Sequence, residues 1–192
     1  PFETFVGALL KVRGYSTLLR QYVRGKCISH EIDVVASRGE TQGHKATKCI
    51  VECKFHNLPH AKCHIQSALY SWARFLDVRD ASPDIDSAWL ATNTKFSSDV
   101  IQYADCVGLK LLGWSFPSHE SIQVRIEENQ LYPITVLSGI NARNFSKLHA
   151  IGIILVKELA SAPNELLLSS GLQPRETEPL KQEAKKVLSN RG

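Results

Sequence analysis

The feature of the sequence that most constrains its fold is a pair of apolar, β-branched runs that carry charged residues. The runs are SHEIDVVA at 29–36 and KCIVECKF at 48–55. Successive side chains of a β-strand point to opposite faces, so Glu52 and Lys54 should share one face. Asp33 stands in the first run, directly before an apolar strand end. Burying such charges is costly unless something compensates them. The sequence therefore predicts two strands whose charged residues, Asp33, Glu52 and Lys54, belong to one functional site.

The rest of the first two thirds of the chain predicts an α/β fold with a central mixed β-sheet flanked by helices. Apolar residues recur at helical spacing up to Gly14, and Val, Ile, Tyr and Thr are concentrated in short runs bounded by turn residues. Ser97 or Ser98 is a suitable N-cap. The expected elements are a helix before Gly14, a β-hairpin at 17–24 and 28–37, a polar connection at 38–46, a strand at 48–55, a helix after Pro59 to about Val78, a strand at 86–92, a helix at about 97–107 and a strand at 109–114.

The pattern of expected secondary structure changes after residue 130. From Pro133 onward, short helical segments are expected with no strand between them. The sequence therefore predicts a domain at 1–130 and a small all-helical module at 131–192. The expected separators of its helices are Gly139, Gly152, Pro163, Gly171 and Pro179.

The chemistry predicted for the charged strands is metal-dependent hydrolysis. Mg²⁺ prefers hard oxygen ligands, typically one or two carboxylates together with waters and a phosphate oxygen, which suits Asp33 and Glu52. Metal ions activate water and neutralise phosphate charge, and Lys54 would orient or polarise the attacking water. The alternative is that the three residues form a solvated salt-bridge cluster on an exposed sheet face.

The spacing of Asp33 and Glu52-Cys53-Lys54 resembles the PD-(D/E)XK nuclease signature. With FETFVGALLKVRGY, SHEIDVVA, IVECKF and TNTKFSSDVIQYA, residues 1–115 are most similar to Mrr-type restriction endonuclease domains. The resemblance implies a restriction-endonuclease-like core in which Asp33 and Glu52 bind Mg²⁺ or Mn²⁺. It implies that Lys54 is the catalytic lysine and that Glu3 assists from the first helix. Ile32 replaces the proline of the family's name.

Three further residues resemble the RecB-like branch of these nucleases. A histidine near the aspartate can join the metal shell there, which makes His30 a candidate ligand, although a structural histidine at a strand edge is equally consistent. Gln66 and Tyr70 share a helical face and resemble the QxxxY motif. A tyrosine at such a position can instead be a core residue. His60 and His64 are interpreted as exposed or phosphate-facing and not as zinc ligands.

The C-terminal segment around Gly152 resembles a helix-hairpin-helix. In such motifs, turn N–H groups and a helix N-terminus receive a DNA phosphate. Gly152 would form the turn, and Lys157, Lys147 and Arg143 could supplement the contact. A second candidate hairpin turns at Gly171. The alternative is that the module serves packing or protein interaction.

Composition supports these expectations weakly. The formal charge of +4 suits a polyanionic partner such as DNA. An odd number of cysteines, five, fits reduced thiols in a cytoplasmic protein. No apolar run is long enough to span a bilayer, so no membrane partner is expected. The chain starts at Pro1 and contains no Met, as an excised fragment would.

The sequence thus predicts a Mg²⁺-dependent DNA endonuclease. Two staggered cuts need two active centres, so the protein could act as a homodimer. One alternative is an inactive DNA-binding module that retains the nuclease fold. Another is a protein-interaction domain in which the charged cluster is structural.

Overall fold

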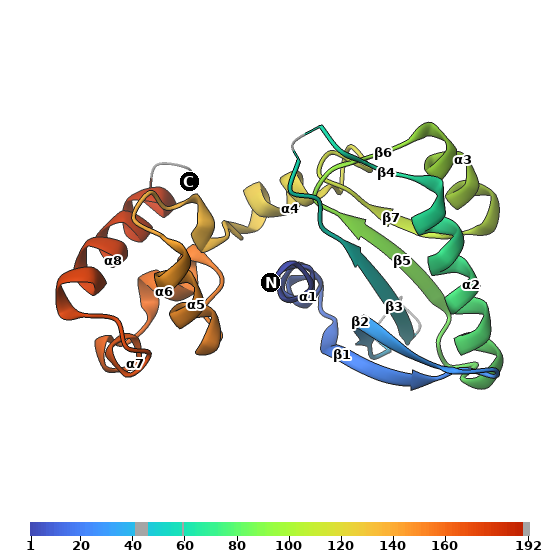
Figure 1. Ribbon diagram of the computed structural model, residues 1–192, viewed down its shortest axis with the longest axis horizontal. Helices are drawn as coiled ribbons and strands as arrows, with labels where there is room; N and C mark the ends of the chain where they lie inside the picture. The colour runs from blue at the N-terminus through green and yellow to red at the C-terminus, as the bar shows by residue number, and fades with distance from the viewer. Residues whose placement is uncertain (41–45, 59, 190–192) are drawn as a thin grey trace. The chain divides into compact units, whose positions relative to one another are not determined.

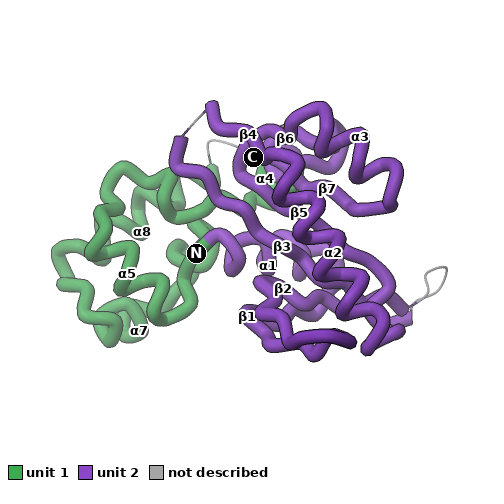
Figure 2. The backbone as a smooth tube through the Cα atoms, turned by 45° about the vertical axis from the view of Figure 1, so that its right-hand side comes forward, with its two compact units in different colours: residues 1, 125–192 green, residues 2–124 purple. Residues whose placement is uncertain are grey.

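The computed structural model describes residues 1–40, 46–58 and 60–189. The chain divides into two compact units, one formed by residues 2–124 and the other by residues 125–192 with Pro1 (Figure 2). Most of the polar connection predicted at 38–46, and Pro59, lie outside the described residues. None of the described helices is both long enough and apolar enough to cross a membrane.

The larger unit is built on a mixed sheet of five strands, as the sequence predicts. The strand order is β1-β2-β3-β5-β7. The first three strands pair antiparallel, whereas β5 and β7 continue the sheet parallel to β3. A second, two-stranded sheet was not predicted. The main strands are β1 (Ser16–Arg24), β2 (Ser29–Arg38), β3 (Thr47–Lys54), β5 (Ser87–Thr92) and β7 (Lys110–Leu112), and the small sheet pairs β4 (Lys62–Cys63) with β6 (Lys95–Phe96).

Helices cover both faces of the five-stranded sheet. Figure 1 shows α2 (Ile65–Ala81) and α3 (Ser98–Val107) along one face and α1 (Phe2–Val12) at the other. Ser97 caps α3, because its hydroxyl accepts a hydrogen bond from the Val100 N–H. The core between the sheet and the first two of these helices includes Ile32, Val35, Ile50, Leu90, Phe75, Val78 and Val100.

The second unit contains helices without a regular strand among the described residues, as expected for the C-terminal module. Two helical hairpins follow each other, and each turns at a glycine with positive φ, Gly152 at 81° and Gly171 at 88°. That backbone conformation strongly favours glycine. The elements are α4 (Ile122–Asn129), which crosses the division between the units, the 3₁₀ helix η1 (Ile134–Val136), α5 (Ala142–Ala150), α6 (Val156–Ser161), α7 (Asn164–Ser169) and α8 (Pro174–Ser189).

One expected separator in this unit was wrong. Pro179 does not divide two helical segments but lies inside α8. A proline there removes a backbone hydrogen bond within the helix. Pro179 is exposed, so water can solvate the carbonyl that loses its partner. The neighbouring Thr177 and Leu180 are buried and hold the helix through packing.

Candidate active site at the carboxyl end of strand β3

Asp33 lies where strand β2 separates from strand β3. The pairing of β1 with β2 continues on both sides of Arg20 and Asp33 but skips these two residues, and Arg20 has a φ of 50°. The pairing of β2 with β3 reaches Val34 opposite Val51 and extends no further toward Asp33. Instead, the backbone N–H of Cys53 donates a hydrogen bond of 2.7 Å to Oδ2 of Asp33. The Asp33 carboxylate is therefore turned toward the end of β3.

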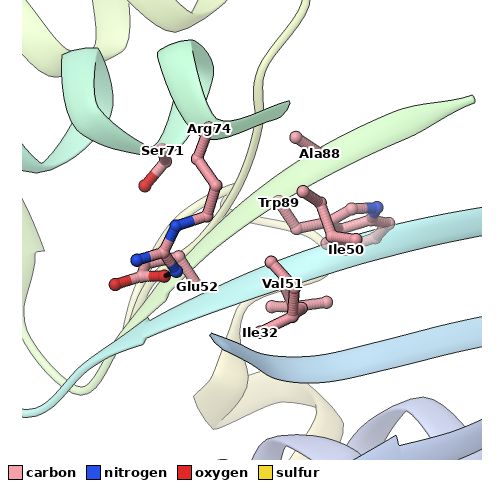
Figure 3. Close-up of a pocket in the computed structure, with 8 residues that line it drawn as sticks. All are labelled: Ile32, Ile50, Val51, Glu52, Ser71, Arg74, Ala88 and Trp89. Atoms are coloured by element: carbon pink, nitrogen blue, oxygen red, sulfur yellow. Dashed lines mark hydrogen bonds and ion pairs between the residues drawn. The ribbon is translucent and has the colours of Figure 1, made fainter. Parts of the chain in front are cut away.

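Glu52 is held between two cations on the face of the sheet that α2 covers. Its side chain is only 8% exposed, and its Oε1 lies 2.6 Å from the Nζ of Lys54. Its Oε2 accepts a hydrogen bond from Nη1 of Arg74, which extends from α2 (Figure 3). The same Arg74 nitrogen donates to the backbone oxygen of Glu31 at 3.0 Å. Glu52 and Lys54 thus share one face, as their spacing predicts.

The charges of the site act on one another strongly enough to shift several pKa values. Burial raises the pKa of Asp33, the Cys53 N–H lowers it, and the charges of Glu52 and Glu3 raise it further. Burial also raises the pKa of Cys53 well above its usual value, followed by the charges of Asp33, Glu3 and Glu52. The carboxylate charges that act on the pKa values of Asp33 and Cys53 are thus those of Glu3, Asp33 and Glu52. The structure gathers Glu3, Asp33 and Glu52 around the end of β3.

The ammonium of Lys54 remains protonated in this setting. Partial burial acts to lower its pKa, but the hydrogen bond and charge of Glu52, with the charge of Asp33, outweigh burial, so the pKa is raised. A lysine with a raised pKa is a cation and a hydrogen-bond donor at neutral pH. In this arrangement Lys54 can orient a water molecule or a phosphate oxygen, and it is not a base.

Glu3 enters the site from helix α1 together with a residue that the sequence did not suggest. Nη2 of Arg20 lies 3.2 Å from Oε2 of Glu3. Arg20 belongs to β1 and stands at the position that the strand pairing skips opposite Asp33. The irregular backbone at Arg20 and Asp33 therefore lies where the Arg20 guanidinium pairs with the Glu3 carboxylate.

Tyr70 lies over the site and not in the core. Its side chain is 53% exposed, its hydroxyl accepts a hydrogen bond of 2.5 Å from Nη2 of Arg74, and the Arg74 guanidinium lies 4.5 Å from the ring centroid. The Nζ of Lys54 lies 6.0 Å from the same centroid. Gln66 is exposed one turn earlier on α2. The helix after Lys54 thus brings Tyr70 to the charged cluster.

His30 has a different partner. Its Nε2 lies 2.8 Å from Oδ2 of Asp77, one helical turn beyond Arg74 on α2. The Asp77 carboxylate also accepts hydrogen bonds from the N–H groups of Cys27 and Ile28, so it fastens the β1–β2 turn to the helix. His30 belongs to this structural cluster, and the structure does not bring it to Asp33 as a metal ligand.

The donor set that remains fits a hard divalent cation. In residues 1–40, 46–58 and 60–189, no three His, Cys, Asp or Glu side chains are arranged to hold a metal ion together. Mg²⁺ does not require such a set, because it is commonly bound through one or two carboxylates, waters and substrate oxygens. Asp33 and Glu52 supply two carboxylates on adjacent strands. Burial is the main cause of the raised pKa of Asp33 and the charge of Glu52 adds to it, and a bound cation would offset both effects.

Arg74 is a second residue of the site that sequence reasoning missed. It lies four residues after Tyr70, as Tyr70 lies four residues after Gln66, so all three follow one helical face. A continuation of that spacing is the signal that could have found it. A small cavity beneath α2 adjoins the Arg74–Glu52 pair, with walls formed by Ile32, Ile50 and Trp89 (Figure 3).

The hairpin residues of the C-terminal unit already have intramolecular partners. Oε2 of Glu158 accepts hydrogen bonds of 2.9 Å from the N–H groups of Ile154 and Leu155, just after Gly152. Glu176 accepts in the same way from the Gln173 N–H after Gly171. These carboxylates take the N–H groups that a DNA-binding hairpin would offer to a phosphate.

The predicted basic residues of the hairpin differ in their surroundings. The Nζ of Lys147 donates to the carbonyl oxygen of Gly171, linking the two hairpins. Arg143 is exposed, and Lys157 is partly buried. The packing therefore assigns Lys147 a structural contact, while Arg143 remains open to solvent.

Comparison with known proteins identifies relatives of the whole chain. The sequence model of the family described as AF1548-like, C-terminal, matches residues 132–188. An uncharacterized protein of Archaeoglobus fulgidus is 40% identical over 181 residues, covering 94% of this chain and 98% of the relative. The crystal structure of the protein of unknown function AF1548 is similar with a TM-score of 0.84 and 39% identity, over 98% of this chain and 97% of that chain.

A repair endonuclease from Pyrococcus abyssi is a much more distant structural neighbour. It has a TM-score of 0.41 and 12% identity, over 56% of this chain and 41% of that chain. A likeness at this level carries no argument about function. The full-length similarity to the Archaeoglobus protein does establish descent, and the chain belongs to the AF1548-like family.

Proposed function

We propose that this protein is a metal-dependent nuclease that hydrolyses phosphodiester bonds of DNA. The observation that carries the proposal is the meeting of Asp33, Glu52 and Lys54 at the end of β3, with two acidic side chains partly or largely buried. Their order along the chain resembles the PD-(D/E)XK signature. Lys54 and Arg74 both pair with Glu52, whereas the Asp33 carboxylate is bonded to the backbone N–H of Cys53 in β3.

Each residue has a role that its surroundings support. Asp33 and Glu52 would hold Mg²⁺ or Mn²⁺, which when bound supplies charge neutralisation at the phosphate and activation of the attacking water. Lys54, held protonated by Glu52, would orient that water or donate to a phosphate oxygen. Glu3 would assist the carboxylates of the site from α1. The Tyr70 ring, which lies beside the Lys54 ammonium, would restrict the position of that ammonium.

The test is cleavage of supercoiled plasmid with Mg²⁺ or Mn²⁺ by the parent protein and by Asp33→Asn, Glu52→Gln and Lys54→Ala. The proposal predicts nicked or linear product from the parent only, and none in EDTA. Asp80→Asn, which changes an exposed acidic residue on α2, is the matched control, and this variant should retain full cleavage activity. Equal product from all five proteins would show that the cleavage comes from another source.

A DNA-binding module without turnover is the second candidate, and one observation favours it. Arg74 and Lys54 together neutralise Glu52 without any metal ion. An inactive descendant of a nuclease would be stabilised in this way. It predicts that the parent protein retains DNA in a binding assay but yields no product with either metal ion.

A further inference from the structure

The segment that follows strand β3 lies beside the segment that follows strand β5. Both segments begin at the candidate active site. Lys54 is paired with Thr92 in the last register position, and the Thr92 hydroxyl donates to the Lys54 carbonyl at 2.8 Å. The Asn93 side chain then bonds both backbone groups of His56: its Oδ1 accepts from the N–H at 2.8 Å, and its Nδ2 donates to the carbonyl at 2.9 Å. The two segments are thus fixed to each other beyond the sheet.

This fixed segment presents large apolar side chains to solvent. Phe55 is 59% exposed although its ring packs on Phe2 at a centroid distance of 5.7 Å, and Leu58 is 71% exposed. Single exposed apolar residues are ordinary on protein surfaces. Here two of them follow the catalytic lysine candidate within four residues, on either side of His56, whose backbone Asn93 holds. Such an exposed apolar projection, formed by Phe55 and Leu58, is suited to contact with flat, apolar groups.

The same two segments next form the small parallel sheet, which brings two lysines together. Lys62 and Lys95 are direct partners in the register of β4 and β6, and both are exposed, whereas their neighbours Cys63 and Phe96 are buried partners on the other side. Two ammonium groups at directly paired positions repel each other. Within the described residues, neither ammonium forms an ion pair that would offset the repulsion. An anion between the two lysines would.

The lysine pair is linked to the apolar projection through Asn93. Lys95 is two residues from Asn93, a distance of at most about 7 Å along an extended chain, and Asn93 is bonded to the residue that follows Phe55. A nucleic-acid strand presents phosphates and base faces at such spacing. In a duplex the base faces are stacked and hidden, whereas unpaired bases can lie on aromatic and apolar side chains.

We propose that Phe55, Leu58, Lys62 and Lys95 form a ridge that binds an unpaired DNA strand, with one phosphate between the two lysines and bases against Phe55 and Leu58. The proposal names the substrate class of the nuclease proposed above and rests on it for the claim that the bound strand is cut. The preferred substrate is DNA with a single-stranded or frayed segment at the site of cleavage.

The test measures binding of the full chain in EDTA, so that it does not depend on turnover. Fluorescence anisotropy is recorded over a salt series with a labelled single-stranded oligodeoxynucleotide, the single-stranded RNA of the same sequence, the corresponding DNA duplex, and the duplex with a single-stranded tail. Phe55→Ala/Leu58→Ala should weaken single-strand binding about 5-fold or more, since stacking contributes at that level for each base, and should leave duplex binding unchanged. Phe55→Trp should keep the affinity of the parent, which separates the loss of stacking from a loss of fold.

The lysine pair has its own expected result and a matched control. Lys62→Ala/Lys95→Ala should lower the steepness of log K against log salt by about 0.7 for single strands, the value for one released phosphate contact. Lys48→Ala/Lys110→Ala removes the same charge from the starts of strands β3 and β7. In this variant the slope of log K against log salt should stay close to that of the parent. Equal effects of the two lysine variants, equal loss of single-strand and duplex binding in the apolar variant, or tighter binding of single-stranded RNA would overturn the proposal. Absence of metal-dependent cleavage with the binding pattern intact would instead remove only the nuclease function.

Discussion

Arg74 donates a hydrogen bond from helix α2 to the carboxylate of Glu52 on strand β3, and both side chains are largely buried. If Glu52 is a metal ligand, this guanidinium competes with the metal for the same carboxylate. The pair therefore links the stability of the metal-free protein to its affinity for the cation.

We expect Arg74→Ala to lower the stability of the metal-free protein and to raise its affinity for Mn²⁺. Breaking a buried ion pair leaves an uncompensated charge, at a cost of roughly 3 kcal/mol, near the low end of the usual range because Lys54 still contacts Glu52. Denaturant unfolding and calorimetry with Mn²⁺ measure the two effects. Arg79→Ala, at an exposed position on the same helix, is the control. Unchanged or weaker Mn²⁺ binding would argue against Glu52 as a ligand.

Asp33→Asn should abolish cleavage without lowering the thermal stability of the metal-free protein. Folding raises the pKa of Asp33, so the folded state favours the protonated carboxyl, and the stability that this group contributes is lost as pH rises through the folded pKa. The asparagine is uncharged and its oxygen can still accept the Cys53 N–H. The melting temperature at neutral pH should therefore stay the same or rise. A marked fall would indicate a structural salt-bridge cluster instead of a functional site.

Asp77→Asn should destabilise the protein at neutral pH, and the difference from the parent should shrink in acid. Hydrogen bonds from the Cys27 N–H and from His30 lower the pKa of Asp77 in the folded state. A depressed pKa contributes stability that is present above the unfolded value, near 3.9, and is lost as pH falls below it. Melting temperatures of both proteins from pH 7 to pH 3 measure this. A difference that does not depend on pH would contradict the role given to the Asp77 charge.

Gly25→Ala should be destabilising by about 2 kcal/mol, within the range for overpacking. A Cβ at position 25 would lie 2.0 Å from Oδ2 of Asp77 and 2.7 Å from the carbonyl oxygen of Ile28. Gly39→Ala is the matched control, because a Cβ there meets no atom of the described residues within 4 Å. Urea unfolding of both variants provides the comparison. Equal stability of the two would mean that the turn does not pack on Asp77 in solution.

Much of the larger unit could be predicted because its elements carry strong local patterns. Charged and apolar residues alternate from Val51 to Phe55 in the third strand, and Ser97 precedes a helix that ends at Gly108. The two-residue strands β4 and β6 escaped prediction because two residues show no periodicity. Pro179 was misjudged because the packing of Thr177 and Leu180 outweighs one lost hydrogen bond.

The site could be predicted only where its residues are near each other in sequence. Glu52 and Lys54 are two apart, so alternation places both on one face. Asp33 needed the register of two strands and an irregular backbone at Arg20, neither of which a pattern of residue types specifies. The pairing of His30 with Asp77 and of Arg74 with Glu52 depends on how α2 lies on the sheet. Such contacts between distant segments follow from packing and not from local spacing.

The most direct measurement of the central claim is an anomalous difference map from crystals of the protein soaked in Mn²⁺. The account predicts one strong peak between the carboxylates of Asp33 and Glu52, with the Arg74 guanidinium moved off Glu52, and no peak in Asp33→Asn crystals treated alike. An empty site between the two carboxylates, with Arg74 still bound to Glu52 at millimolar Mn²⁺, would contradict it.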